Sequence, residues 1–580
     1  MLQVSGGQLI GRERELGRLV ALLDQAAAGE PIVALVSGDA GIGKTRLIAE
    51  LAAQAAERDV TVLSGRCAEL GDSVPYLPLA DALRNATTGP AAAPGLLEAL
   101  AARPVLGRLL PDRGSADQPG ADLPGMAQQQ LFGAVLGMLA EIAADRPVLL
   151  ILEDLHWADR STRDLLTFLS RVLHRERIAI IATYRTDDLH RSHPLRSVIG
   201  ELLRLPSVTA VELGPLGAAA MAEYLTTLAG RRLEAAAVDE IIRRAEGNAY
   251  YAEELLAASD DGCELPAGVA GLLIARVERL SASAQQVLRA AAVAGRRMDD
   301  DIVRQASGLA APDYEEGVRE SVANQLLIPD GDQGYAFRHA LIREAVYADL
   351  LPGERTRLHA RLAELLADET RLAAVPGSAA ELAHHYLASH DIPGAFAASV
   401  RAGKEAERLA APAEAHRHFD QALALWDRVN EPEKLAGIDR GWLAFDSANN
   451  TAASGEVARA VHQLRRLYGY LDVAADPVLV NRVGERLAYF LLETDEVAPA
   501  AEAAEAAVNA LPEEPPRWER ARALATHAQT LLYFLLDEGP ARAKAEQARE
   551  AARIAAAPWV EADALVTLGL LDERAGMVAW

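Results

Sequence analysis

The stretch from Gly38 to Thr45 constrains this chain more than any other. It reads G-D-A-G-I-G-K-T and fits the pattern G-x-x-x-x-G-K-[ST] in full. An apolar run at residues 32–36 comes directly before it and predicts a buried strand, and residues 46–51 predict the first turns of a helix. Because strand, glycine-rich loop and helix follow in this order, we expect a phosphate-binding loop (P-loop).

The residue types in this loop suit a nucleotide. Glycine lets the backbone turn its N–H groups inward around a phosphate, and the helix N-terminus adds a partial positive charge. Lys44 would reach the β- and γ-phosphates, and the Thr45 hydroxyl would hold Mg²⁺. The chain has only four lysines, the others being Lys404, Lys434 and Lys544, and still places one here. The alternative, a glycine-rich turn without a ligand, is disfavoured by the complete motif.

Length and charge limit the classes of protein to consider. At 580 residues the chain is too long for one core, and about three to five domains are expected. A net charge of −25 gives no general attraction to DNA or anionic membranes. We expect a cytoplasmic protein, because neither a signal peptide nor a membrane-length apolar run is present. Cys67 and Cys263 fit no metal or redox spacing and are expected to be buried thiols.

Two further strands end in charged residues. The apolar run at residues 148–152 precedes Glu153 and Asp154, which makes this segment a candidate Walker B strand. One carboxylate would hold Mg²⁺ and the other would orient the attacking water, and the sequence leaves open which does which. The strand at residues 178–183 leads to Arg185, which would sense the γ-phosphate; an exposed loop arginine is the alternative.

The remaining pattern predicts a multidomain fold. An α/β P-loop NTPase core, including a last strand over Val208 to Leu213, would occupy residues 1–216. A helical lid at 217–262 follows. Three helices and a hairpin then predict a winged-helix domain at 263–352, without a basic recognition helix. The stretch 86–125, rich in Ala, Pro, Gly and Asp, is expected to be a partly helical surface insertion.

The last part of the chain, 353–580, predicts an all-α solenoid resembling tetratricopeptide repeats (TPR). Tyr489-Phe-Leu-Leu-Glu493 recurs as Tyr533-Phe-Leu-Leu-Asp537, an offset of 44 residues, and each copy is followed by an Ala/Glu-rich helix. Repeated helix pairs of this kind are typical of α-solenoids. We expect the solenoid to be incomplete at Trp580, where a further repeat has only begun.

The motifs together resemble a family of signal-transduction ATPases with numerous domains (STAND), a branch of the AAA-like P-loop proteins. The nearest resemblance is to the large ATP-binding regulators of the LuxR type, the group of the maltose-regulon activator. It rests on LIGRERELGRL from Leu9, GDAGIGKTRL from Gly38, LLILEDLHWAD from Leu149, ATYRTDDL from Ala182, ELGPL from Glu212, AEGNAYYAEELL from Ala245 and FRHALIREAVY from Phe337.

The resemblance implies roles for individual residues. Ile10, Gly11 and Arg12 would line the adenine and ribose side of the pocket, and Pro215 would pack on adenine from the lid. His339 resembles the histidine that related ATPases place against the ADP β-phosphate, although a core or capping histidine is an equal alternative. The predicted ligands of ATP or ADP and Mg²⁺ also include Gly38, Gly41, Gly43, Lys44, Thr45 and Arg46, with Thr45, Glu153 and Asp154 for the metal.

Two departures from the family limit the comparison. The Walker B strand ends in Glu153-Asp154, where the strictest pattern has aspartate first, so hydrolysis is expected to be slow. The helix-turn-helix domain that such regulators carry after the solenoid is not found before Trp580. DNA is therefore expected to be bound only through a region or partner outside this chain.

The hypothesis from sequence is an ATP-dependent switch that regulates transcription. ADP would hold it closed, and an inducer or a partner protein at the solenoid would favour ATP binding and self-assembly. A housekeeping AAA-type ATPase of the origin-loading or remodelling kind is one alternative. A scaffold with purely structural nucleotide is another. DNA-stimulated turnover would favour the first alternative, and nucleotide that never exchanges would favour the second.

Overall fold

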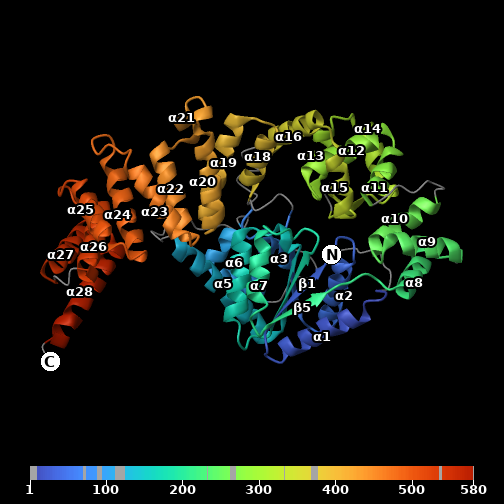
Figure 1. The fold of residues 1–580 in the computed structure, drawn as a ribbon, viewed down its shortest axis with the longest axis horizontal. Helices are drawn as coiled ribbons and strands as arrows, with labels where there is room; N and C mark the ends of the chain where they lie inside the picture. The colour runs from blue at the N-terminus through green and yellow to red at the C-terminus, as the bar shows by residue number, and fades with distance from the viewer. Residues whose placement is uncertain are drawn as a thin grey trace. The chain divides into compact units, whose positions relative to one another are not determined.

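The computed structural model describes most of the chain, and its residues fall into two compact units. The first unit is drawn from residues 1–116 and 130–395, and the second from residues 117–129 and 396–580. The described residues are 9–68, 74–87, 95–110, 124–231, 233–260, 269–331, 334–367, 377–534 and 538–578. Figure 1 shows the elements of each unit. The predicted boundaries at 216, 262 and 352 remain predictions.

A five-stranded parallel sheet forms the base of the first unit (Figure 1). Its order is β2-β3-β4-β1-β5, which places the strand before the P-loop between two others. The strands are β1 (Ile32–Gly38), β2 (Thr61–Arg66), β3 (Val148–Glu153), β4 (Ile178–Arg185) and β5 (Val208–Glu212). Because neighbouring strands run parallel, Gly38 lies opposite Arg185, and Arg66 lies opposite Glu153. The carboxyl ends of four strands thus meet at one edge of the sheet.

The three central strands, β3, β4 and β1, are buried on both faces, as their near-continuous apolar sequences predict. Helices α1 (Glu13–Ala27) and α2 (Lys44–Glu57) share a core with β1, β3 and β4, in which Leu47 and Ile151 are fully buried. The other helices of this α/β region are α3 (Leu77–Thr87), α4 (Leu96–Ala101), α5 (Pro124–Asp145), α6 (Arg160–Val172) and α7 (Pro194–Leu202), with short 3₁₀ turns η1 (Pro104–Leu109) and η3 (Leu155–Trp157). Only residues 95–110 and the ends of the predicted 86–125 insertion are described, and they include α4 and η1.

Three helices follow the sheet: α8 (Ala218–Ala229), α9 (Ala235–Ala245) and α10 (Ala249–Asp260). They enclose a small core of their own, in which Met221, Leu225 and Leu255 are inaccessible to solvent. The turn between α9 and α10 contains two consecutive residues with positive φ, Glu246 at 49° and Gly247 at 81°. This left-handed turn ends α9 and directs the chain back towards the sheet.

The next segment differs in detail from its prediction. In the described part of the chain, four helices rather than three precede the hairpin, a fifth follows it, and a third strand is present. They are α11 (Val269–Glu278), α12 (Ala282–Ala294), β6 (Arg297–Asp299), α13 (Asp300–Ser307), α14 (Ala311–Ala323), β7 (Leu327–Asp330), β8 (Gly334–Phe337) and α15 (Ala340–Asp349). The antiparallel sheet has the order β6-β8-β7. A three-residue strand is too short to show a period of two, and Asp299 begins a helix directly after it by capping α13.

Helices α16 (Pro352–Leu366) and α18 (Ser378–Ala388) complete the first unit before α19 (Ile392–Arg408) leads into the second. The second unit is helical throughout its described residues. Its helices are α20 (Pro412–Leu425), α21 (Pro432–Ala436), α22 (Arg440–Ala453), α23 (Val457–Tyr468), α24 (Pro477–Glu493), α25 (Val497–Asn509), α26 (Trp518–Phe534), α27 (Glu538–Ile554) and α28 (Pro558–Val578), with a 3₁₀ turn η4 (Trp426–Arg428).

The predicted 44-residue repeat corresponds to helix pairs in the second unit. Tyr489 and Tyr533 lie near the carboxyl ends of α24 and α26, and each helix is followed by its alanine-rich partner, α25 or α27. Residues 535–537 of the second copy lie outside the described residues. Alanines such as Ala504 and Ala545 are fully buried, because small side chains let the paired helices approach closely.

Two other expectations concern cysteine and membranes. Cys67 is a buried free thiol, as predicted, and Cys263 lies outside the described residues. Within the part of the chain that the structure describes, we find no helix with the length and apolar character needed to cross a bilayer.

Candidate functional site

The P-loop has the backbone conformation that its glycines predict. Gly41 and Gly43 have φ of 79° and 105°, and Gly43 is the residue directly before α2. Side chains other than hydrogen are strained in this region of φ, so the glycines allow the loop to curl over the helix N-terminus. The first turn of α2 therefore presents its unbonded N–H groups beside the loop, an arrangement suited to anions.

Lys44 lies inside this loop and is only 7% exposed. Its Nζ donates to the carbonyl of Gly38 at 2.5 Å and to that of Asp39 at 2.8 Å. Burial lowers the pKa of Lys44 to about 8, even though Asp154 opposes the shift. Among the described residues the ammonium bonds to neutral carbonyls alone, so a phosphate placed here would meet a desolvated positive charge.

The acidic end of β3 is already paired with an arginine. Glu153 is 2% exposed, and its Oε1 lies 2.8 Å from Nη2 of Arg66 at the end of β2. Arg66 Nε lies 3.5 Å from Asp154 Oδ2. Asp154 has a positive φ of 61°, and its N–H donates to the hydroxyl of Thr183 on β4 at 3.0 Å. The sheet itself therefore fixes the direction in which Asp154 points.

A second arginine reaches Asp154 from the helical segment beyond the sheet. Arg296, between α12 and β6, places Nη1 3.2 Å from Asp154 Oδ2. Burial opposes the charged form of Asp154, but Arg66 and Arg296 outweigh it and hold its pKa below the ordinary value. Burial and the neighbouring Arg66 lower the pKa of Arg296 to about 10, so it remains charged at neutral pH.

Arg185 is paired with the same helical segment. Its Nη1 lies 2.8 Å from Glu344 Oε1 on α15 and 3.5 Å from Asp188 Oδ2. Arg185 is only 6% exposed, which excludes the alternative of an exposed loop arginine. We call Arg296–Asp154 and Arg185–Glu344 the two latch pairs, because each joins the sheet edge to the segment 296–344.

The predicted adenine-side residues connect the N-terminal segment to the lid helices. Arg12 donates through Nη2 to the carbonyls of Ile42 at 3.1 Å and Gly214 at 2.7 Å. Gly11 has φ of 68°, and a Cβ there would lie 2.6 Å from the Ala220 side chain of α8. Ile10 is buried. Pro215 is exposed and packs against Gly247, where a Cβ would lie 2.5 Å from its own.

His339 caps a helix and stacks on an aromatic ring. Its Nδ1 accepts from the N–H of Leu341 at 3.3 Å, and its ring lies 3.8 Å from that of Tyr250 at 12°. Burial and the nearby Arg296 and Arg185 lower its pKa to about 3, so the ring is neutral. With Nδ1 accepting, the proton of the neutral ring lies on Nε2, which is then a donor. The capping alternative is therefore observed, and a phosphate contact through Nε2 stays a prediction.

His156 is a further buried group that sequence reasoning missed. It lies in η3, directly after Asp154, and its side chain is 1% exposed. Neither ring nitrogen has a hydrogen-bond partner among the described residues, and Nε2 lies 3.5 Å from Asp188 Oδ2. Burial lowers the pKa of His156 to about 3. It was missed because one histidine in a loop carries no spacing signal.

The structure brings Lys44, Asp154 and Arg185 to one edge of the sheet. Electrostatic effects on Lys44 and His339 come from the same neighbours, Asp154 and Arg185. Thr45 and Arg46 begin α2 beside them and are partly exposed. The set fits a nucleotide and Mg²⁺ on two observations: Lys44 Nζ is bonded only to carbonyls, and a buried oxygen of Glu153, Oε2, has no hydrogen-bond partner in the described chain.

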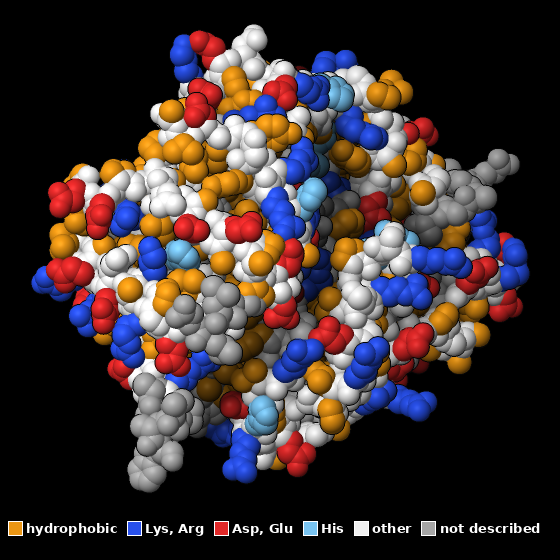
Figure 2. Space-filling model, turned by 60° about the vertical axis from the view of Figure 1, so that its left-hand side comes forward, with side chains coloured by type: hydrophobic (Ala, Val, Ile, Leu, Met, Phe, Trp, Pro, Cys, Tyr) orange, Lys and Arg blue, Asp and Glu red, His pale blue; other side chains and the backbone are white. Residues whose placement is uncertain are grey.

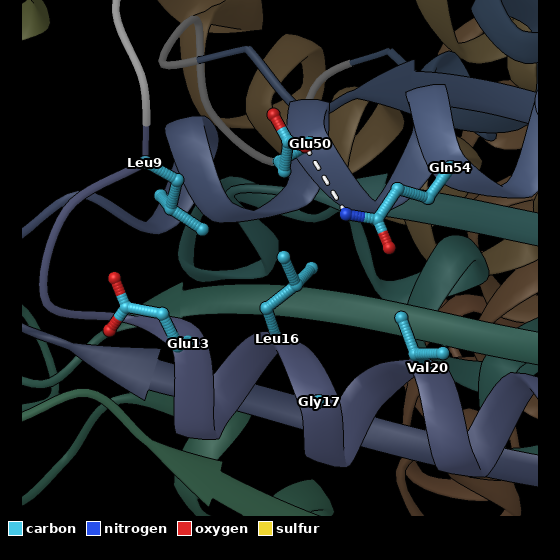
Figure 3. A pocket seen from close by; sticks show the side chains of 7 residues that line it. All are labelled: Leu9, Glu13, Leu16, Gly17, Val20, Glu50 and Gln54. Atoms are coloured by element: carbon cyan, nitrogen blue, oxygen red, sulfur yellow. Dashed lines mark hydrogen bonds between the residues drawn. The ribbon is translucent and has the colours of Figure 1, made fainter.

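One groove lies apart from these residues. It measures about 310 Å³ and runs between α1 and α2. Figure 3 shows Leu16 and Val20 of α1 pointing across it towards Glu50 and Gln54 of α2, which are joined by a hydrogen bond of 3.2 Å. None of the predicted nucleotide residues lines this groove, so we assign it no part in the phosphate site.

The sheet and loop define a P-loop ATPase core. Comparison with known proteins relates this core to the AAA-type ATPases. Residues 8–181 match the family model of the AAA ATPase domain. An uncharacterised protein of Rhizobium meliloti is 27% identical over 498 residues, covering 80% of this chain and 47% of its own length. The chain therefore spans about half the length of that curated relative.

Two solved structures align with large parts of the chain at low sequence identity. A STAND protein with a tetratricopeptide repeat sensor from Pyrococcus horikoshii is 12% identical, with a TM-score of 0.42, covering 96% of this chain and 85% of its own. A mutant RuvB of Thermotoga maritima is 15% identical, with a TM-score of 0.25, covering 57% and 93%. Neither score is high enough to support an inference about activity.

Proposed function

We propose that this chain is an ATP-binding signal-transduction switch with slow, regulatory hydrolysis. The observation that carries the proposal is the pair of latches. Asp154 and Arg185 are the residues expected to act on nucleotide, and both are ion-paired to the segment 296–344. The two pairs have opposite polarity, since one uses an arginine of that segment and the other a glutamate. Binding of ATP with Mg²⁺ would therefore compete with both contacts, whereas ADP would leave them in place.

The proposed switch also assigns a role to each region of the chain. The helices and small sheet at 269–349 would be the winged-helix domain, 218–260 the lid, and the helix pairs of the second unit the TPR-like sensor. The combination supports a STAND regulator of the LuxR type. The AAA ATPase match to residues 8–181 supports the nucleotide part of the proposal, and the repeat pairs support the sensor part.

The switch would work by different affinities for nucleotide in two states. In the closed state the latch pairs hold Asp154 and Arg185, and His339 presents Nε2–H to a diphosphate. In the open state Asp154, Glu153 and Thr45 would be available to hold Mg²⁺, which neutralises phosphate charge. A ligand can shift the equilibrium only as far as its affinities for the two states differ.

The partners of the switch follow from its surface and composition. On the face that Figure 2 shows, acidic and basic side chains are both spread over much of the surface, and the net charge of the chain is −25. This supports DNA contact only through a region or partner outside this chain. An inducer or protein would bind the helix pairs, and the open state would self-assemble. The transcriptional output is part of the proposal.

The test is the nucleotide that co-purifies with the full chain and with Lys44→Ala. We expect bound ADP or ATP in the parent and little in the variant, because Lys44 supplies the buried charge. Equal nucleotide in both would overturn the P-loop assignment. Light scattering with ADP and then with a non-hydrolysable ATP analogue tests the switch itself, and an unchanged assembly state in both would contradict it.

A further inference from the structure

Asn248 joins the turn between α9 and α10 to the P-loop. Its Nδ2 donates to the carbonyl of Ala40 at 2.8 Å, across a separation of 208 residues. Its Oδ1 accepts from the N–H of Tyr251 at 3.1 Å, which caps the first turn of α10. Because the N–H of Tyr251 requires an acceptor, the amide orientation is set, and the NH₂ group must face the loop.

A second bond from the same turn holds the next peptide of the loop. The N–H of Tyr250 donates to the carbonyl of Gly41 at 3.2 Å. The turn and the loop are too close here for a larger residue at position 41. A Cβ on Gly41 would lie 2.8 Å from Asn248 Oδ1 and 2.9 Å from Tyr250 Cβ. Glycine at position 41 is therefore required by the close approach as well as by its positive φ.

These bonds determine where a loop amide points. In a trans peptide the C=O and the following N–H point in opposite directions. When Asn248 holds the Ala40 carbonyl on the lid side, the N–H of Gly41 is turned to the opposite side of the loop. Phosphate-binding loops work by directing successive N–H groups at the anion.

We propose that Asn248 is a positioning residue for the phosphate site. It acts from the lid on the Ala40–Gly41 peptide, and so makes phosphate affinity depend on where the start of α10 lies. The same turn also contacts the segment 296–344, because Tyr250 stacks on His339, which caps the helix that carries Glu344. This inference rests on the proposed nucleotide binding and gives a role to Asn248, which lies in the AEGNAYYAEELL motif but to which the resemblance assigned none.

The test compares Asn248→Asp with Asn324→Asp in the full chain. Aspartate keeps the cap on α10 but replaces the donor facing Ala40 with a carboxylate oxygen. Asn324 also donates from Nδ2 to a backbone carbonyl, that of Glu320 at 2.9 Å, and lies at the end of α14. The control therefore makes the same chemical change away from the loop.

The measurements are the dissociation constants of ADP and of adenosine by calorimetry, together with the melting temperature without nucleotide. For Asn248→Asp we expect ADP affinity to fall by about tenfold to a hundredfold, the usual effect of losing a hydrogen bond at a charged site. Adenosine affinity should stay at the parent value, because the phosphates alone lose a contact, and the melting temperature should fall no further than in Asn324→Asp, which loses the same kind of hydrogen bond. A general defect in folding would instead lower ADP affinity, adenosine affinity and melting temperature together.

Each other outcome is decisive. Parent-like ADP binding by Asn248→Asp, or an equal loss in Asn324→Asp, overturns the inference and leaves the proposed function intact. Failure of the parent itself to bind ADP overturns the proposed function and the inference with it. Asn248→Ser keeps a capping oxygen but is too short to reach Ala40, so it must reproduce the selective loss of ADP affinity if Asn248→Asp folds poorly.

Discussion

Arg296 places Nη1 3.2 Å from Asp154 Oδ2, so a guanidinium from beyond the sheet neutralises a carboxylate expected to serve Mg²⁺. Arg296→Ala should therefore raise the steady-state rate of ATP hydrolysis by about tenfold, since couplings of 1–3 kcal/mol are typical between linked states. Phosphate release by the full chain measures it. The neighbouring Arg297, whose partner is Asp330 at 3.2 Å, supplies the control Arg297→Ala. Equal rates in the two variants would contradict the latch.

The other latch pair is tested by Glu344→Gln, which keeps the shape of the side chain and removes its charge. The partner that lies 2.8 Å from Arg185 would lose its negative charge while Asp188 stays in place, so we expect bound ADP to dissociate about tenfold faster. Stopped-flow release of a fluorescent ADP analogue measures this rate. Asp349→Asn, at the exposed end of the same helix, is the control. A release rate like that of the control counts against the pair.

His339→Asn separates the two roles of this histidine. Asparagine can still cap α15 through its side-chain oxygen, but it loses the Nε2 donor and the stacking on Tyr250. We expect ADP affinity to fall by about tenfold while adenosine affinity is unchanged, as calorimetry would show. If His339 is a capping residue only, ADP affinity will equal that of the parent.

The stability of the second unit is expected to depend on pH through Glu407. Burial, reinforced by the nearby Asp446, raises the pKa of Glu407 to about 7, and Asn450 Nδ2 donates to its Oε1 at 2.5 Å. The folded unit therefore binds an extra proton between about pH 4.5 and 7, and its stability falls as pH rises through this window. Glu407→Gln removes the proton site and should flatten the dependence.

Differential scanning calorimetry of the full chain at pH 5 and pH 8 measures this effect. At pH 8 we expect Glu407→Gln to melt about 2–4 °C above the parent, the shift that roughly 1 kcal/mol produces in a domain of this size. At pH 5 the two should differ little. Glu433→Gln, on the exposed α21, should leave the parent difference between the two pH values unaltered.

Sequence reasoning found the residues that lie in one strand–loop–helix segment or end a strand. Lys44, Glu153 and Arg185 follow apolar runs, and parallel strands bring such ends to a common edge without further information. Arg296 and Asn248 could not be found in this way. Each acts through one tertiary contact, across 142 and 208 residues respectively, and an arginine or asparagine at a helix end is common in any protein.

The short elements were missed for a similar reason. The strand β6 has three residues and pairs with β8, so its existence depends on a partner more than 30 residues away. Arg66 was within reach of prediction, because it ends β2 opposite Glu153. A charged residue at the end of every predicted parallel strand deserves inclusion in a candidate site.

The near-absence of lysine outside the P-loop has a practical consequence for chemistry in solution. In the first unit Lys44 is the sole lysine, and the other three, Lys404, Lys434 and Lys544, belong to the second unit. With a pKa of about 8, Lys44 has an appreciable fraction of free amine under mild alkaline conditions. An acylating reagent read out by peptide mass spectrometry would therefore report on the phosphate site through one peptide. The peptides of the three remaining lysines would provide an internal standard in the same digest.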